Sequence, residues 1–203
     1  LRDRVRSLTA VSSPHSIERN LRREWRAEVR AAASWVPERW RPAVAWTAWL
    51  CDLPTLARLE QGGEVLPWMA DDAQLASFAI DDRALRQHEL VSAGVGALAG
   101  DTDVLTAWRQ QFEALLPAGD PGVRRLHDFV ARVDAYRQQP DTRDATRKAP
   151  GQLLEARAAR LVRRNLQEAV TVFAHLLLVA LELGRLRGGL VRRALFGDWL
   201  AVA

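Results

Sequence analysis

The hydrophobic and polar positions along the chain give no sign of β-strands. No stretch shows the sustained alternation of Val, Ile, Thr and aromatic residues that is typical of a strand, and Asn-Gly and Asp-Gly hairpin turns are absent. Ala, Leu, Arg, Glu and Gln dominate instead, and these residues favour helices. The pattern therefore predicts an all-α fold, a multi-helix bundle of about eight helices with no significant β-sheet.

Proline, glycine and acidic residues indicate where the helices should begin and end. We expect Asp101 or Thr102 to cap a helix that runs to Leu116, and we expect Gly184 and the Gly188-Gly189 pair to bend or interrupt the last helix. Short segments are expected around 67–69 and from 71 to 78. The other predicted helices span residues 17–34, 43–50, 54–61, 83–98, 123–138 and 152–193.

A chain of 203 residues can bury a substantial core without disulfides or metal ions. We expect one all-helical domain over residues 1–203. A proline- and glycine-rich cluster at 117–122 is a candidate subdivision, and the polar stretch 139–151 is predicted to be an exposed loop. Cys51 is the sole cysteine, so no intrachain disulfide can form, which fits a reducing compartment.

The formal net charge is +4, and Lys148 is the sole lysine among 29 basic residues. Two interpretations of this arginine bias stay open. It can reflect a GC-rich genome, or it can build a basic face for nucleic acid or anionic lipid. Since 25 acidic residues are interspersed with the basic ones, the sequence favours the first interpretation.

The sequence offers no catalytic, cofactor-binding or metal-binding residues. The four histidines match no HExxH motif, and neither a phosphate-binding GxxxxGK[ST] loop nor a GxSxG motif occurs. We expect structural roles for the histidines. His175 lies inside an apolar run, where it could hydrogen-bond a neighbouring helix or titrate.

Five of the eight tryptophans lie between residues 25 and 49. They could form a tryptophan-rich core between the first two helices, or an aromatic surface for a partner. Trp46 and Trp49 are three residues apart and are expected to pack. Trp35 and Trp40 flank Pro37 in a turn, and we predict that they are exposed and bind a partner.

The C-terminal stretch joins an apolar run to a charged patch. Val170–Leu181 is shorter than the roughly twenty residues that a bilayer requires, so we predict a buried helix and no transmembrane span. Glu182 and Arg185 are spaced to pair along one helix face. The patch is either a solvated helix end or a partner surface, and its candidate partner-binding residues are Glu182, Arg185, Arg187, Arg192 and Arg193.

The same stretch resembles the C-terminal helix of the C subunit of archaeal A-type ATPases, a family that includes the d subunit of V-type ATPases. The family pattern is an apolar helix followed by Glu, two residues, Asn, Leu or Ile, and Arg. Glu182, Leu186 and Arg187 fit this pattern, while Arg185 replaces the usual Asn. The opening LRDRVRSL is also similar to the start of the family. Members have three similar helical units, and this chain has room for about two.

The resemblance implies a non-catalytic helical subunit that links the membrane rotor ring to the central stalk of a rotary ATPase. Its partners would be protein subunits of that membrane-associated complex, and it would need no cofactor. It would be located in the cytoplasm or at the inner face of the membrane. A second hypothesis is a nucleic-acid-binding or regulatory protein that uses the arginines of 17–30 and 153–164. A third is an enzyme with a pocket in the helical bundle.

Overall fold

The computed structural model describes residues 14–98, 103–137, 150–164 and 168–200. Residues 14, 136–137, 150–151, 153, 164 and 193–200 are described by their backbone alone. Within these ranges the chain forms eight α-helices joined by turns and short 3-10 helices, and no strand occurs there. The predicted all-α fold is confirmed. The helices are α2 (Pro14–Ala33), α3 (Arg41–Trp46), α4 (Leu53–Glu60), α5 (Arg83–Ser92), α6 (Val104–Ala114), α7 (Pro121–Arg137), α8 (Pro150–Arg164) and α9 (Ala169–Leu200).

The chain divides into two compact units. Unit 1 comprises residues 1–45 and 116–203, and unit 2 comprises residues 46–115. The first boundary falls at the end of α3, and the second lies next to the 117–122 cluster, where the sequence suggested a subdivision.

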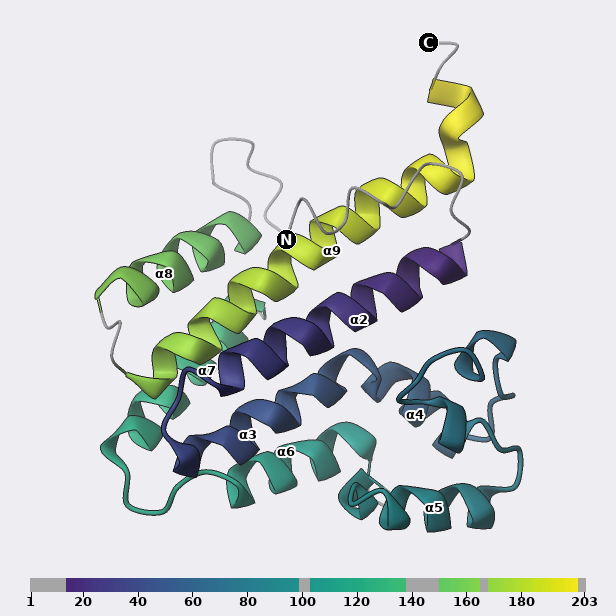
Figure 1. The fold of residues 1–203 in the computed structure, drawn as a ribbon. Helices are drawn as coiled ribbons and strands as arrows, with labels where there is room; N and C mark the ends of the chain where they lie inside the picture. The colour runs from purple at the N-terminus through teal and green to yellow at the C-terminus, as the bar shows by residue number, and fades with distance from the viewer. Residues whose placement is uncertain (1–13, 99–102, 138–149, 165–167, 201–203) are drawn as a thin grey trace. The chain divides into compact units, whose positions relative to one another are not determined.

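Helix α9 is the centre of unit 1. It packs against α2, α7 and α8, and Figure 1 shows it running between α8 and α2. Helix α2 buries one face at helical spacing, through Ile17, Leu21, Trp25, Val29 and Ala32. Helix α9 contributes the apolar side chains of Val170, Val172, Phe173, Leu176, Val179 and Leu183. The apolar run therefore forms the core of this unit, as a buried helix should.

Unit 2 is held by α4, α5 and α6 with three short 3-10 helices between them. Two tryptophans bond reciprocally across it: the indole of Trp46 donates to the carbonyl of Trp108 at 3.1 Å, and that of Trp108 to the carbonyl of Trp46 at 3.3 Å. Each buried indole N–H is thereby satisfied. The unit's most deeply buried large apolar side chains are Leu56, Leu59, Met69, Leu75, Phe78, Leu90 and Leu98.

Several helix boundaries differ from the prediction. The helix predicted for 43–50 is α3, which starts at Arg41 and passes at Thr47 into a 3-10 helix. Helix α5 ends at Ser92 rather than Leu98, because Gly94 adopts a φ of 75° that ends the helix. Asp103, not Asp101 or Thr102, caps α6, since its carboxylate accepts the backbone N–H of Thr106 at 3.0 Å.

The predicted last helix is in fact two helices. Helix α8 ends at Arg164 and α9 begins at Ala169, whereas α9 continues without a break through Gly184, Gly188 and Gly189. The expected interruption at these glycines is wrong. A helical glycine costs about 1 kcal/mol relative to alanine, and the packing of α9 on its neighbours outweighs that cost. The 139–151 loop predicted as exposed lies outside the described residues, except for its last two positions, which begin α8.

One described helix is long and apolar enough to cross a membrane by length and composition. It is the 169–192 part of α9, and less than half of its most apolar stretch is buried. A central core helix passes the same test, and α9 packs on three other helices of unit 1. The prediction that the chain has no transmembrane span therefore stays a prediction.

Candidate functional site

The charged patch at the end of α9 is held by ion pairs from two other helices. Arg185 lies 3.6 Å from Glu182 on α9, which confirms the pair expected from their spacing. Arg185 also forms a two-pronged ion pair with Glu155 of α8, and Arg187 pairs with Glu18 of α2. The patch thus joins α2, α8 and α9 within unit 1 (Figure 1).

The charges in this patch stabilise one another. The hydrogen bond from Arg185 lowers the pKa of the Glu155 carboxyl, with the positive charge of Arg185 adding to the effect. The hydrogen bond to Glu155 in turn raises the pKa of Arg185. Both arginine side chains stay open to solvent, with 49% of Arg185 and 64% of Arg187 exposed. Ion pairs this exposed contribute little to stability. Because the side chains are exposed, both arginines remain accessible for contact with a partner.

The rest of the predicted α9 surface is also exposed where it is described. Arg192 is exposed, whereas the side chain of Arg193 lies outside the described residues. A Cβ atom added at Gly184, Gly188 or Gly189 would meet no neighbouring atom within 4 Å. The described part of this end of α9 therefore combines arginine side chains with open helix backbone, which a partner could approach closely.

The two tryptophans predicted to be exposed have opposite environments. Trp35 is 58% exposed, as expected from its place beside Pro37. Trp40 is only 1% exposed, so the prediction of exposure is wrong for it. Trp40 closes a 3-10 helix (Glu38–Trp40) that points its ring inward, against the edge of Phe173 at 6.1 Å between ring centroids.

Asp120 is the reason that Trp40 can be buried. Its carboxylate accepts the indole N–H of Trp40 at 3.1 Å, the Nε–H of Arg39 at 2.9 Å and the backbone N–H of Gly122 at 2.8 Å. The Gly122 bond caps the start of α7, where Pro121 occupies the first helical position. The Gly122 bond is the main cause that lowers the pKa of Asp120, with Trp40 and Arg39 adding to it.

His175 lies next to Trp35. The two rings are 5.1 Å apart and tilted by 58°. His175 Nε2 is buried without a hydrogen-bond partner among the described residues, and it lies 3.9 Å from a Glu28 carboxylate oxygen. That distance exceeds hydrogen-bond length. The sequence singled out His175 but could not indicate that Trp35 would be its neighbour.

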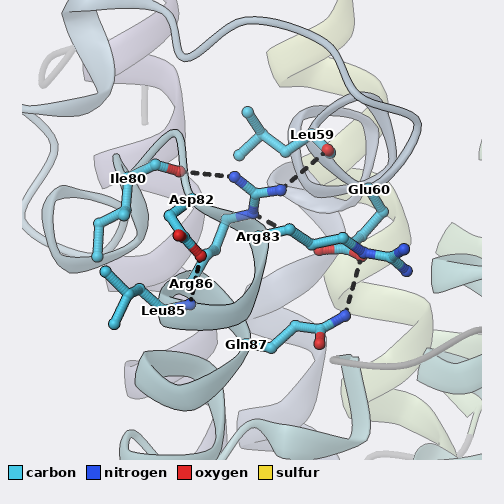
Figure 2. A network of polar contacts seen from close by, with 8 residues as sticks. All are labelled: Leu59, Glu60, Ile80, Asp82, Arg83, Leu85, Arg86 and Gln87. Carbon is cyan, nitrogen blue, oxygen red and sulfur yellow. Dashed lines mark hydrogen bonds and ion pairs between the residues drawn. The ribbon is translucent and has the colours of Figure 1, made fainter.

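A second polar cluster lies in unit 2, and it was not predicted from the sequence. The guanidinium of Arg86 donates to the carbonyls of Ile80 at 2.6 Å and Leu59 at 3.0 Å, and its Nε lies 3.6 Å from Glu60 (Figure 2). Glu60 also accepts the Nε–H of Arg83 at 3.0 Å. Only 4% of the Arg86 side chain is exposed. Arg86 lies four residues before the buried Leu90, so the two side chains share one face of α5. This spacing is the feature of the sequence that indicates burial of Arg86.

The part of the chain that the structure describes contains no cluster of three or more His, Cys, Asp or Glu side chains that could hold a metal ion. Comparisons with protein-family models, curated proteins and solved structures found no match to this chain.

Proposed function

We propose that the chain is a non-catalytic helical subunit of a V/A-type rotary ATPase, which links the membrane rotor ring and the central stalk. The structural feature that supports the proposal is the C-terminal end of α9. Glu182, Leu186 and Arg187, which carry the resemblance to the A-type ATPase family, lie on one unbroken helix. Acidic residues of α2 and α8 fix the two arginines of that motif region in place.

This arrangement suits docking better than bond chemistry. A docking surface gains specificity when its charged groups are held in position before the partner arrives. Arg185 and Arg187 are held in this way and still have about half or more of their side chains exposed. The exposed Gly184 and Gly188 let a partner helix approach the backbone of α9 closely.

Nucleic-acid binding is supported less well. An uninterrupted cationic surface is what nucleic acid requires, and several arginines of unit 1 are instead paired with acids. Arg125 pairs with Glu168, as Arg185 does with Glu155 and Arg187 with Glu18. Arg26, on the face of α2 considered for nucleic acid, is buried.

Purification of a tagged copy from the native host tests the proposal. Gently solubilised membranes should yield the chain together with rotor-ring and stalk subunits, identified by mass spectrometry. Recovery of the chain from the soluble fraction alone, free of these subunits, would refute the assignment.

The arginines of α9 give a sharper prediction. Replacing both Arg185→Gln and Arg187→Gln should strongly reduce recovery of the partner subunits, because two positioned guanidinium groups are lost from the contact. Helicity and melting temperature should stay nearly unchanged, since exposed ion pairs contribute little to folding. Quantitative mass spectrometry of the co-purified subunits and circular dichroism make the two measurements.

The matched control is the double change Arg109→Gln and Arg132→Gln. It removes the same charge from exposed positions on α6 and α7 and should leave recovery unchanged. A collapse of melting in the Arg185 and Arg187 variant would mean that these residues act in folding. Equal losses in both variants would mean that only net charge matters, and the docking surface would then be ruled out.

A further inference from the structure

A pocket of about 220 Å³ opens in unit 1 beside His175. The turn after α2 contributes Trp35 and Pro37, the end of α8 contributes Val162, and the start of α9 contributes Val172 and His175. Most of these side chains are apolar, so a ligand that fills the pocket would displace water from apolar surface and gain binding free energy.

One wall of the pocket is aromatic. Trp35 is the most exposed tryptophan in the described chain, and its ring stands 5.1 Å from the ring of His175. An exposed tryptophan at the edge of a pocket offers a large flat surface at little conformational cost, which is why such residues anchor ligands and partners. Two rings at this spacing present edges and faces against which a third ring can pack.

The pocket also carries an acceptor that lacks a donor. Glu168 lines it, and the Oε2 atom of this residue is buried without a hydrogen-bond partner among the described residues. The other carboxylate oxygen, Oε1, is held by Arg125, so the carboxylate cannot simply turn away to satisfy Oε2. A buried acceptor normally has a partner. Because Oε2 has almost no surface open to a water-sized probe, a ligand N–H or O–H supplies that partner once the side chains around Oε2 move aside.

The volume limits the ligand to about one ring system. An apolar cavity of ~150 Å³ accommodates benzene, and drug-sized pockets begin near ~300 Å³. The pocket lies between these sizes.

We propose that this pocket binds one aromatic ring that carries an N–H or O–H donor, such as an indole or a phenol. The ring packs against Trp35 and His175, and its donor bonds to Glu168 Oε2. The site goes beyond the proposed rotary-ATPase function and does not depend on it. The same chemistry is offered by a free small molecule and by a tryptophan or tyrosine side chain of another protein.

The test uses 5-fluoroindole with the full chain and follows the probe by ¹⁹F NMR, which is blind to the eight native tryptophans. Saturable binding is expected in the high-micromolar to millimolar range, as for a ligand of about ten non-hydrogen atoms. Trp35→Ala should weaken binding about tenfold or more, because it removes the aromatic wall. Its melting temperature should stay near that of the wild type, because Trp35 is largely exposed.

Two controls make the result specific. Leu85→Ala removes an exposed apolar side chain in unit 2 and should leave binding unchanged. A probe methylated at the indole nitrogen, 5-fluoro-1-methylindole, should bind about tenfold more weakly, because it cannot donate to Glu168.

Binding of N-acetyl-5-fluorotryptophan amide identifies the source of the ring. Affinity equal to or above that of 5-fluoroindole supports a protein side chain, and exclusion of the amide while 5-fluoroindole binds supports a free small molecule. Absence of saturable binding by both probes at millimolar concentration would overturn the proposal. Unchanged affinity in Trp35→Ala would overturn it as well.

Discussion

Replacing Arg86 by methionine should destabilise unit 2 by about 3–5 kcal/mol, the usual cost of removing one partner of a buried ion pair. Methionine keeps the unbranched apolar stem of arginine but removes the guanidinium. Glu60 would keep the half-exposed Arg83 but lose its buried counterion, and the carbonyls of Leu59 and Ile80 would lose their side-chain donors (Figure 2). Because Leu59 lies in the last turn of α4, the cation also compensates the negative end of that helix.

Urea unfolding followed by circular dichroism, with hydrogen exchange of the amides of residues 46–115, measures this loss. Arg83→Gln is the matched control, because Arg83 binds the same carboxylate from a half-exposed position and should cost far less. The additional change Glu60→Leu should restore part of the stability of Arg86→Met, because it removes a buried carboxylate that in this variant keeps the half-exposed Arg83 as its counterion. Equal effects of Arg86→Met and Arg83→Gln would contradict this interpretation of the cluster.

Replacing Asp120 by alanine should destabilise unit 1 by about 2–4 kcal/mol. Loss of the cap of α7 costs about 1 kcal/mol, and the buried indole N–H of Trp40, left without an acceptor, adds about 1–3 kcal/mol. Thermal and urea unfolding measure the change. Asp128→Ala, an exposed aspartate on α7, is the control and should have little effect.

The charge of Asp120 also makes a contribution to the free energy of unfolding that depends on pH. Its pKa is lower in the folded chain than in the unfolded chain, so its stabilising contribution is complete at neutral pH. The contribution is lost as the solution is acidified below about pH 4 and through the lowered folded pKa. The free-energy difference between the wild type and Asp120→Asn should therefore shrink in this acidic range. A difference that stays constant between neutral pH and pH 3 would contradict this role of the charge.

Local chemistry made the helical fold predictable. Pro54 occupies the first turn of α4, and Asp82 accepts the N–H of Leu85 at 3.0 Å at the start of α5, as acidic residues before a helix should. Asp72 likewise accepts the N–H of Gln74 at 3.0 Å. These bonds join residues two or three positions apart, so the sequence contains all that they require.

Contacts between distant residues were not predictable in the same way. Trp40 lies beside Pro37 and looked exposed, but Asp120, 80 residues further on, provides the acceptor that allows its burial. The Glu182–Arg185 pair followed from spacing along one helix, whereas Glu18 and Glu155 reach α9 only because α2 and α8 pack on it. Sequence reasoning therefore found the arginines of the candidate docking surface but not the acids that hold them.

Photo-crosslinking from α9 in the native host tests the central claim most directly. A benzoylphenylalanine residue at Gly188 would have open space around it, since a Cβ atom there meets no neighbour within 4 Å. The proposal expects covalent adducts with a rotor-ring or central-stalk subunit of a rotary ATPase, and none of these from Val91, an exposed control position on α5. Adducts with nucleic acid, or the same adducts from both positions, would contradict the assignment of this end of α9 as the docking surface.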